Sequence, residues 1–193
     1  MIKYCLNMGV KFLNTLLIIA FLFQLISCSK DDVKVKNQIT VGNKIYPLAK
    51  GYIFKAGGPM YNDENEYLGQ IYNIYLTSDD VIYNDNYSFS HSGDDEFLSI
   101  SFLSSKENEI DEGNYIFMDT DYISNCITNT QIYLDWNFNS GVNHGTFWNA
   151  TSGEAHVEKL ESGYKISFWF TLISGSTHEK CHGTFIGPYY PYP

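Results

Sequence analysis

The chain has 193 residues, and its 12 Lys, with no Arg, stand against 22 Asp and Glu, for a formal net charge of −10 at pH 7. Contacts to nucleic-acid phosphates need a basic surface, so this balance argues against nucleic-acid binding. The length suits one domain with a substantial core. With 16 Tyr, 13 Phe and 3 Trp, the placement of the aromatic residues is the main question.

The first 27 residues have the features of a targeting segment. Lys3 and Lys11 are its only charged residues, and the stretch from Phe12 to Ile26 is almost wholly apolar. A basic start followed by an apolar run too short to span a membrane is typical of a secretory signal peptide. The run ends in Leu25-Ile26-Ser27-Cys28.

This ending resembles the lipobox of bacterial lipoproteins. The next residues, Ser29-Lys30-Asp31-Asp32, resemble the surface-export signal of Bacteroidota-type lipoproteins, in which Lys30, Asp31 and Asp32 would carry the signal. The resemblance implies cleavage before Cys28, acylation of Cys28 and a lipid-anchored location at the outer membrane, exposed on the cell surface. Each buried acyl methylene contributes about 0.8 kcal/mol, so several chains on one cysteine make a durable anchor.

After the anchor, residues 28–43 carry three Lys and few large apolar groups. This composition predicts a flexible tether. We therefore expect three parts: a signal peptide over 1–27, a lipidated cysteine with its tether over 28–43, and a single β domain over 44–193.

The domain shows the period-two alternation of half-buried strands. It is clearest in three stretches, 96–102, 131–138 and 164–172, and weaker strands are expected near 50–56, 67–77, 113–118, 144–150, 153–160 and 181–187. The expected core residues are Leu98, Ile100, Phe102, Trp136, Ile166, Phe168 and Phe170. Glycine-containing turns separate these stretches, and Glu161-Ser162-Gly163 is short enough to close a hairpin.

These features predict an all-β fold, an antiparallel β-sandwich of about nine or ten strands. A lipocalin-like closed barrel is the alternative, because alternation alone does not separate the two. The succession of Gly153–Val157, Gly163–Phe168 and Gly183–Phe185 also resembles the C-terminal half of small Bacteroidota-type surface lipoproteins. That resemblance implies a β fold and transfers no catalytic residue.

Two cysteines, Cys126 and Cys181, remain in the domain. In an oxidising compartment they could pair, and a disulfide closing a loop of this length stabilises a fold by about 4 kcal/mol on the chain-entropy model. Free thiols explain them equally well, since the sequence does not give the Cα separation that a disulfide requires.

The stretch His178-Glu179-Lys180-Cys181-His182 matches the H-E-x-x-H pattern of zinc proteases, which requires a helix. On a strand, residues four apart are separated by about 13 Å, too far for His178 and His182 to share one metal ion. The flanks are strand-like and no acid or histidine follows, so we expect a terminal strand and no catalytic zinc. A structural zinc site that adds Cys126 is a second alternative.

No cofactor is expected, although calcium could bind an acidic loop, since it takes six to eight oxygen ligands. The acidic clusters are Asp63–Glu66, Asp79-Asp80, Asp94–Glu96 and Asp119–Asp121. None has the calcium-loop pattern with its central glycine and terminal glutamate, and solvated turns explain them as well.

Tyr133 and Trp169 fall on the polar faces of their strands, and Trp148 is a further aromatic that could be exposed. Exposed aromatic rings beside amides and carboxylates suit stacking on sugar rings, while cross-strand packing is the structural alternative. We therefore expect a lipid-anchored, non-enzymatic module that binds a glycan, peptide or protein through these three residues. A secreted hydrolase using an acid pair or zinc, and a small-molecule carrier in a barrel, are the alternatives.

Overall fold

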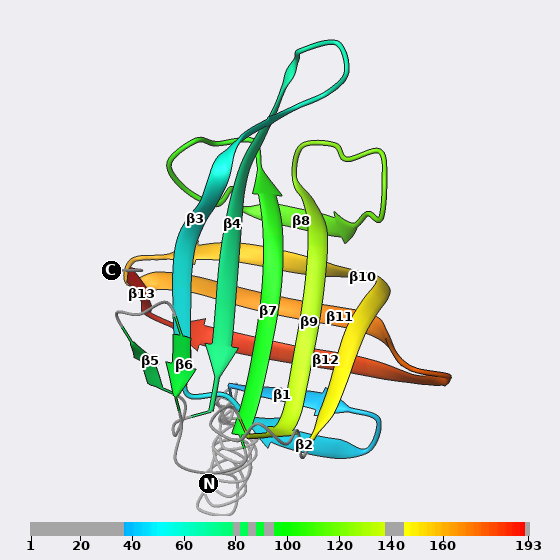
Figure 1. Cartoon of the computed structure of the whole chain (residues 1–193). Helices are drawn as coiled ribbons and strands as arrows, with labels where there is room; N and C mark the ends of the chain where they lie inside the picture. The colour runs from blue at the N-terminus through cyan, green and yellow to red at the C-terminus, as the bar shows by residue number, and fades with distance from the viewer. Residues whose placement is uncertain (1–36, 79–81, 85–87, 91–94, 138–144, 192–193) are drawn as a thin grey trace, which may run out of the picture. The chain divides into compact units, whose positions relative to one another are not determined.

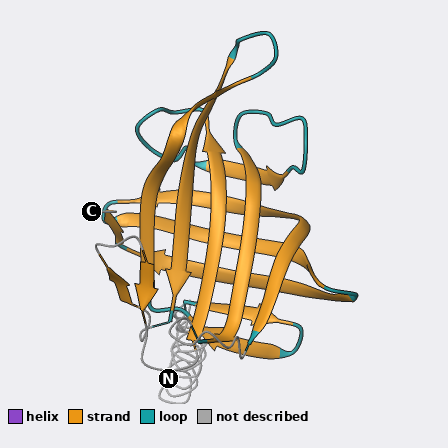
Figure 2. Cartoon of the chain, in the orientation of Figure 1, coloured by secondary structure: helices purple, strands orange, loops and turns teal. Residues whose placement is uncertain are grey.

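A computed structural model describes residues 37–78, 82–84, 88–90, 95–137 and 145–191. The regular secondary structure of these residues consists of strands alone (Figure 2). Within these residues no helix is long and apolar enough to cross a membrane. The strands are β1 (Gln38–Val41), β2 (Lys44–Pro47), β3 (Lys50–Tyr61), β4 (Tyr67–Thr77), β5 (Ile82–Asn84), β6 (Ser88–Ser90), β7 (Asp95–Ser104), β8 (Gly113–Phe117), β9 (Cys126–Trp136), β10 (Thr146–Leu160), β11 (Gly163–Ser174), β12 (Thr177–Gly187) and β13 (Tyr189–Pro191).

Eleven strands form one sheet in the order β13-β3-β4-β7-β9-β8-β10-β11-β12-β1-β2, and β5 pairs separately with β6. The pairs are antiparallel except β13–β3 and β8–β9. The sheet curls so that β3, β4, β7 and β9, here called the front layer, cross over β10, β11 and β12 (Figure 1). The all-β, mostly antiparallel prediction is confirmed. A sandwich of two separate sheets is not, because one hydrogen-bonded sheet supplies both layers.

The long strand β10 takes the chain from one layer to the other. Residues 146–149 pair with β9, and residues 154–157 pair with β8, which fits between β9 and β10 where they diverge. A register shift between Ala150 and Ser152 marks the bend. Gly153 follows with φ 148°, and a Cβ there would lie 2.3 Å from the carbonyl oxygen of Trp169. The sequence suggested two strands here because the bend interrupts the alternation. We call β10 from Ser152 onward, with β11, β12 and β1, the back layer.

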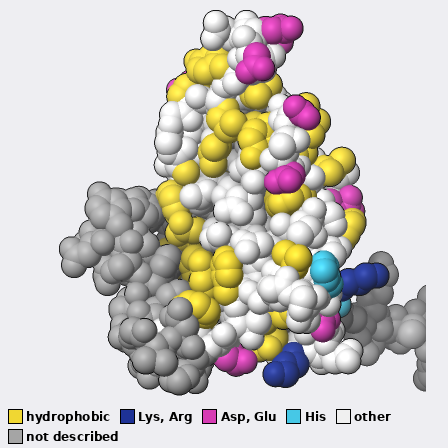
Figure 3. Space-filling view, turned by 45° about the vertical axis from the view of Figure 1, so that its right-hand side comes forward, with side chains coloured by type: hydrophobic (Ala, Val, Ile, Leu, Met, Phe, Trp, Pro, Cys, Tyr) yellow, Lys and Arg dark blue, Asp and Glu magenta, His cyan; other side chains and the backbone are white. Residues whose placement is uncertain are grey.

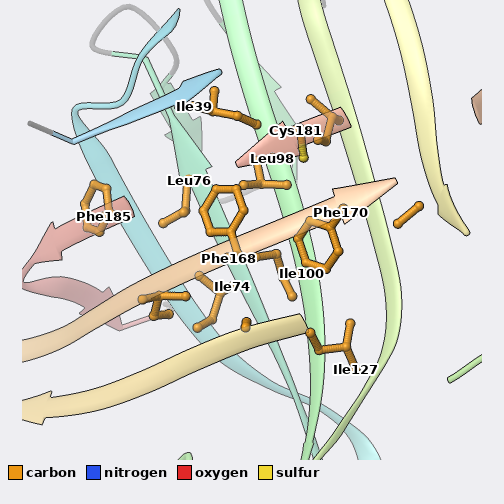
Figure 4. Close-up of a cluster of buried hydrophobic side chains, with 14 of the residues drawn as sticks. Ile39, Ile74, Leu76, Leu98, Ile100, Ile127, Phe168, Phe170, Cys181 and Phe185 are labelled. Carbon is orange, nitrogen blue, oxygen red and sulfur yellow. The ribbon is translucent and has the colours of Figure 1, made fainter. Parts of the chain in front are cut away.

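The core lies between the two layers. Leu98, Ile100 and Phe102 of β7 are at most 1% exposed, and Ile166, Phe168 and Phe170 of β11 are at most 4% exposed. Figure 4 shows the rings of β11 reaching toward the aliphatic side chains of β7. Fully burying one such side chain contributes about 1.5–3 kcal/mol, so this contact holds the layers together. These six core predictions are confirmed.

Trp136 is the exception among the predicted core residues, because it is half-buried on the outer face. Asp135 has φ 52°, and the register with β7 shifts between the pairs of Trp136 and Tyr133. This bulge turns Trp136 to the face of Tyr133, with their ring centroids 5.0 Å apart. A one-residue bulge reverses the alternation that follows it, which explains the error.

The expected boundary at residue 44 is also wrong, because β1 belongs to the sheet. It pairs with β12 on one side and β2 on the other, and Ile39 is 1% exposed. Just before it, the side chain of Asn37 bonds the backbone of Ile186 in both directions, at 2.7 and 2.8 Å. Part of the predicted tether 28–43 is therefore a strand, and four residues are too few to show a clear period.

Candidate binding face

The outer face of the front layer carries a row of aromatic rings that continues onto β10. Successive ring centroids lie 4.8–5.6 Å apart in the order Phe54, Tyr75, Phe97, Tyr133, Phe147. Phe97 is only 7% exposed, and the first four residues have interactions beyond these ring contacts. Burial raises the pKa of the Tyr133 hydroxyl. Tyr133, a predicted platform residue, is thus a packing residue of this row.

Trp148, the second predicted platform residue, lies inside the fold. It is 7% exposed and sits opposite Ile132 on the inner face of β10. Its indole Nε1 is buried and has no hydrogen-bond partner within the part of the chain that the structure describes. The side chain is therefore closed to a surface ligand.

Trp169, the third, is the exposed one, at 47%. It lies on the outer face of β11, opposite Glu154 of β10 and His182 of β12, and both neighbours are exposed. The same line across the sheet runs outward to two further exposed apolar residues, Ile116 at 59% and Ile45 at 65%. We call this line the Trp169 row; its members are Ile116, Glu154, Trp169, His182, Thr40 and Ile45.

A polar line runs beside the Trp169 row, two residues along each strand. It consists of Asn114 of β8, His156 of β10, Ser167 of β11 and Thr184 of β12, and we call it the His156 row. His156 Nδ1 lies 2.7 Å from Asn114 Oδ1, and the Ser167 and Thr184 hydroxyls are 3.4 Å apart. The two rows are about 6.6 Å apart, two residue rises along a strand.

Hydrophobic side chains seen in Figure 3 form separate patches among polar ones. Besides the Trp169 row, the exposed large apolar residues include Tyr61 at 54% and Tyr67 at 41%, at the facing ends of β3 and β4. Their rings contact each other edge to face at 5.9 Å. Tyr61 and Tyr67 therefore pack against each other, whereas Trp169 has polar neighbours on both sides.

The H-E-x-x-H stretch lies on β12, where a strand was expected. His178, Lys180 and His182 are exposed, while Cys181 between them is buried. The Glu179 carboxylate lies beside Gly42 in the β1–β2 turn. The described residues contain no group of three His, Cys, Asp or Glu side chains that could hold a metal ion. The strand gives His182 a place in the Trp169 row instead.

Cys126 and Cys181 are both free and buried. Cys126 starts β9 and Cys181 lies within β12, opposite Phe170. Burial raises the pKa of the Cys181 thiol to about 12 and raises that of Cys126 as well. Because the thiolate is the reactive and metal-binding form, both side chains serve as small apolar groups of the packing.

Where the structure describes them, Asp63–Glu66 and Asp119–Asp121 lie in loops, whereas Asp95 and Glu96 belong to β7. In Asp63–Glu66, the Asn62 Oδ1 accepts the backbone N–H groups of Glu64 and Glu66 at 3.0 and 2.8 Å. Asp95 is buried and accepts a hydrogen bond from the Ser78 hydroxyl at 3.0 Å. Asp79, Asp80 and Asp94 lie outside the described residues, as do Cys28, Lys30, Asp31 and Asp32.

Comparison of the chain with family models, curated proteins and solved structures gives no match. Sequence reasoning found Trp169 but missed its neighbours Glu154, His156 and Asn114. Their residue types carried no signal, since only the pairing of β8, β10 and β11 brings them to one face.

Proposed function

We propose that this chain is a lipid-anchored surface protein whose Trp169 row binds a neutral glycan chain. The observation that carries the proposal is Trp169, an exposed indole on the outer face of β11, between the hydrogen-bonding groups of Glu154 and His182 on the neighbouring strands. An indole face offers apolar surface to the C–H groups of a sugar ring, and flanking polar groups reach its hydroxyls.

A neutral chain fits better than an anionic one. The protein carries a formal net charge of −10, and Glu154 stands beside the indole. A polymer of like charge is repelled by such a field. An outer face that extends over β8, β10, β11, β12, β1 and β2 also suits an extended chain better than a single small molecule.

The test measures the binding of full-length protein, kept in mild detergent, to cellohexaose, xylohexaose, mannohexaose and polygalacturonate. We expect binding to at least one neutral probe and a loss of about 30-fold in Trp169→Ala, since truncating a central aromatic side chain costs about 2 kcal/mol or more. Trp169→Phe should recover part of the loss. Tyr61→Ala, which removes a similarly exposed ring elsewhere, is the matched control. Equal affinity of Trp169→Ala and wild type would reject this site.

The anchor is tested separately. Cells fed a fatty-acid probe should label the wild type and leave Cys28→Ala unlabelled. Replacing Lys30, Asp31 and Asp32 by alanine should keep the lipid but reduce digestion by protease added outside the cells. Labelling of Cys28→Ala at the wild-type level would contradict the lipobox assignment, and unchanged digestion of the triple variant would contradict the export signal.

A further inference from the structure

One ring nitrogen of His156 is hydrogen-bonded, and the other has no partner among the residues that the structure describes. Its Nδ1 lies 2.7 Å from Asn114 Oδ1 across the β8–β10 pair, and the side chain is exposed on the outer face. An amide oxygen only accepts hydrogen bonds, so Nδ1 must carry the hydrogen. In the neutral imidazole, Nε2 is then left as an acceptor.

The position of His156 places this acceptor in the candidate site. His156 of β10 lies opposite Ser167 of β11. Two residues along, on the same outer face, Glu154 of β10 lies opposite Trp169 of β11. A sugar ring stacked on the indole of Trp169 therefore has its edge toward the His156 row, about 6.6 Å away along the strands.

We propose that Asn114 is a specificity-determining residue, which fixes His156 as a hydrogen-bond acceptor that selects a sugar hydroxyl over a carboxylate. A hydroxyl can donate to Nε2, whereas a carboxylate has no hydrogen to give and would face a lone pair. This inference rests on the proposed function of the Trp169 row. It goes further by naming the group that reads the ligand and the chemical class that it rejects.

The charged groups around His156 agree with this selection. Glu154 and Glu158 lie two residues away on the same strand, and Lys165 of β11 is engaged by Glu158 at 2.8 Å. No lysine in the His156 row offsets the acids, so a carboxylate ligand would meet like charge. Asn114 acts through His156 and is a positioning residue.

The first measurement needs no ligand. Nitrogen NMR shifts of histidine-labelled full-length protein in detergent should show His156 as the Nδ1–H tautomer, and Asn114→Ala should lose that preference. Asn129→Ala, an exposed asparagine on β9 of the other layer, is the matched control and should leave the signal unchanged. A His156 tautomer that is the same in wild type and Asn114→Ala would overturn the inference.

The second measurement uses the same four probes. Losing one hydrogen bond costs about 0.5–1.5 kcal/mol, so Asn114→Ala and His156→Ala should bind the neutral probe about 2- to 12-fold more weakly. Asn114→Asp should hold His156 as the imidazolium, whose Nε2–H donates. The affinity for polygalacturonate relative to the neutral probe should then rise, although the aspartate and imidazolium charges cancel.

The outcomes separate the two proposals. Wild-type protein that binds none of the neutral probes would overturn the proposed function and this specificity with it. Wild-type protein that binds, with an unchanged affinity in Asn114→Ala or an unchanged probe ratio in Asn114→Asp, would overturn only the role of Asn114. In that second case, weaker binding by Trp169→Ala would still support the proposed function of the Trp169 row.

Discussion

The two outer faces of this curled sheet use aromatic residues in opposite ways. On the front layer, rings from neighbouring strands contact one another, and Phe97 in the middle is 7% exposed. On the back layer, Trp169 has Glu154 and His182 as its cross-strand neighbours and stays 47% exposed. Cross-strand neighbours, more than alternation along one strand, decide whether an outward aromatic residue packs or remains available.

This difference has an energetic consequence. A ring that is buried against other rings contributes apolar burial and edge-to-face contacts, the latter about 0.5–1.5 kcal/mol each. An indole between polar side chains gains little of either. We therefore expect the front row to contribute to stability and Trp169 to contribute to binding, and the variants below separate the two contributions.

The largest effect should come from the core that both faces share. Phe168→Ala removes a ring that is 4% exposed between the layers, and such truncations cost about 3–5 kcal/mol. Urea unfolding followed by circular dichroism measures the loss. Thr171→Ala, on the outward side of the same strand, is the control. A loss below about 1 kcal/mol for Phe168→Ala would mean that the inner face of β11 is misassigned.

The next variant pair compares the two outer faces directly. Phe97→Ala should lower the free energy of unfolding by about 1.5–3 kcal/mol, the value of burying one such side chain. Trp169→Ala should change it by less than about 0.5 kcal/mol, as exposed positions do, while weakening glycan binding about 30-fold. The same urea titration serves both variants. Equal losses would remove the distinction between a packing face and a binding face.

The sequence was sufficient to predict the features that depend on a single strand, namely the strands themselves and the core residues on them. The alternation around Leu98, Ile100 and Phe102 and around Ile166, Phe168 and Phe170 identified strands and core correctly, because period two reports burial directly. It failed where a single residue breaks the period. The positive φ of Asp135 reverses Trp136, and the bend near Gly153 divides the signal of β10.

The candidate site could not be predicted from the sequence for a related reason. Trp169 was visible as an aromatic residue on a polar face, but Tyr133 satisfied the same criterion and proved to be packed. The difference depends on pairing: Tyr133 meets Phe97 and Phe147, whereas Trp169 meets Glu154 and His182. Register between strands that are distant in the sequence is set by the whole sheet, so no local pattern reveals it.

A third variant tests the bend that separates the faces. In Gly153→Ala, the new Cβ would lie 2.3 Å from the Trp169 carbonyl oxygen, at a φ of 148° that L residues rarely adopt. Strain of this kind costs about 1–3 kcal/mol. Gly58→Ala is the matched control, because a Cβ there meets nothing within 4 Å. We also expect weaker glycan binding in Gly153→Ala, measured as above, since relief of the contact must move β10 or Trp169. Stability equal to that of Gly58→Ala would contradict the tight bend.

The smallest effect concerns the loop over residues 105–112, which leaves the front layer after β7 and meets the back layer at β10. Its Ile110 is 1% exposed, and its Glu109 carboxylate bonds Lys159 of β10 and, at 2.9 Å, Lys106. Hydrogen bonds from Lys159 and then Lys106 lower the pKa of Glu109 from 4.5 to about 2.

A carboxylate with a lowered pKa favours the folded state above the pKa of the unfolded chain, and this contribution is lost as the pH falls through the folded value. Wild type should therefore melt above Glu109→Gln at pH 7, and the gap in Tm should close between about pH 4.5 and pH 2. The exposed pair is screened by solvent, so the gap should be small and should shrink with added salt. Glu161→Gln, in the β10–β11 turn, is the control. A gap that stays constant from pH 7 to pH 2 would show that the contact between Glu109 and Lys159 does not join the two layers.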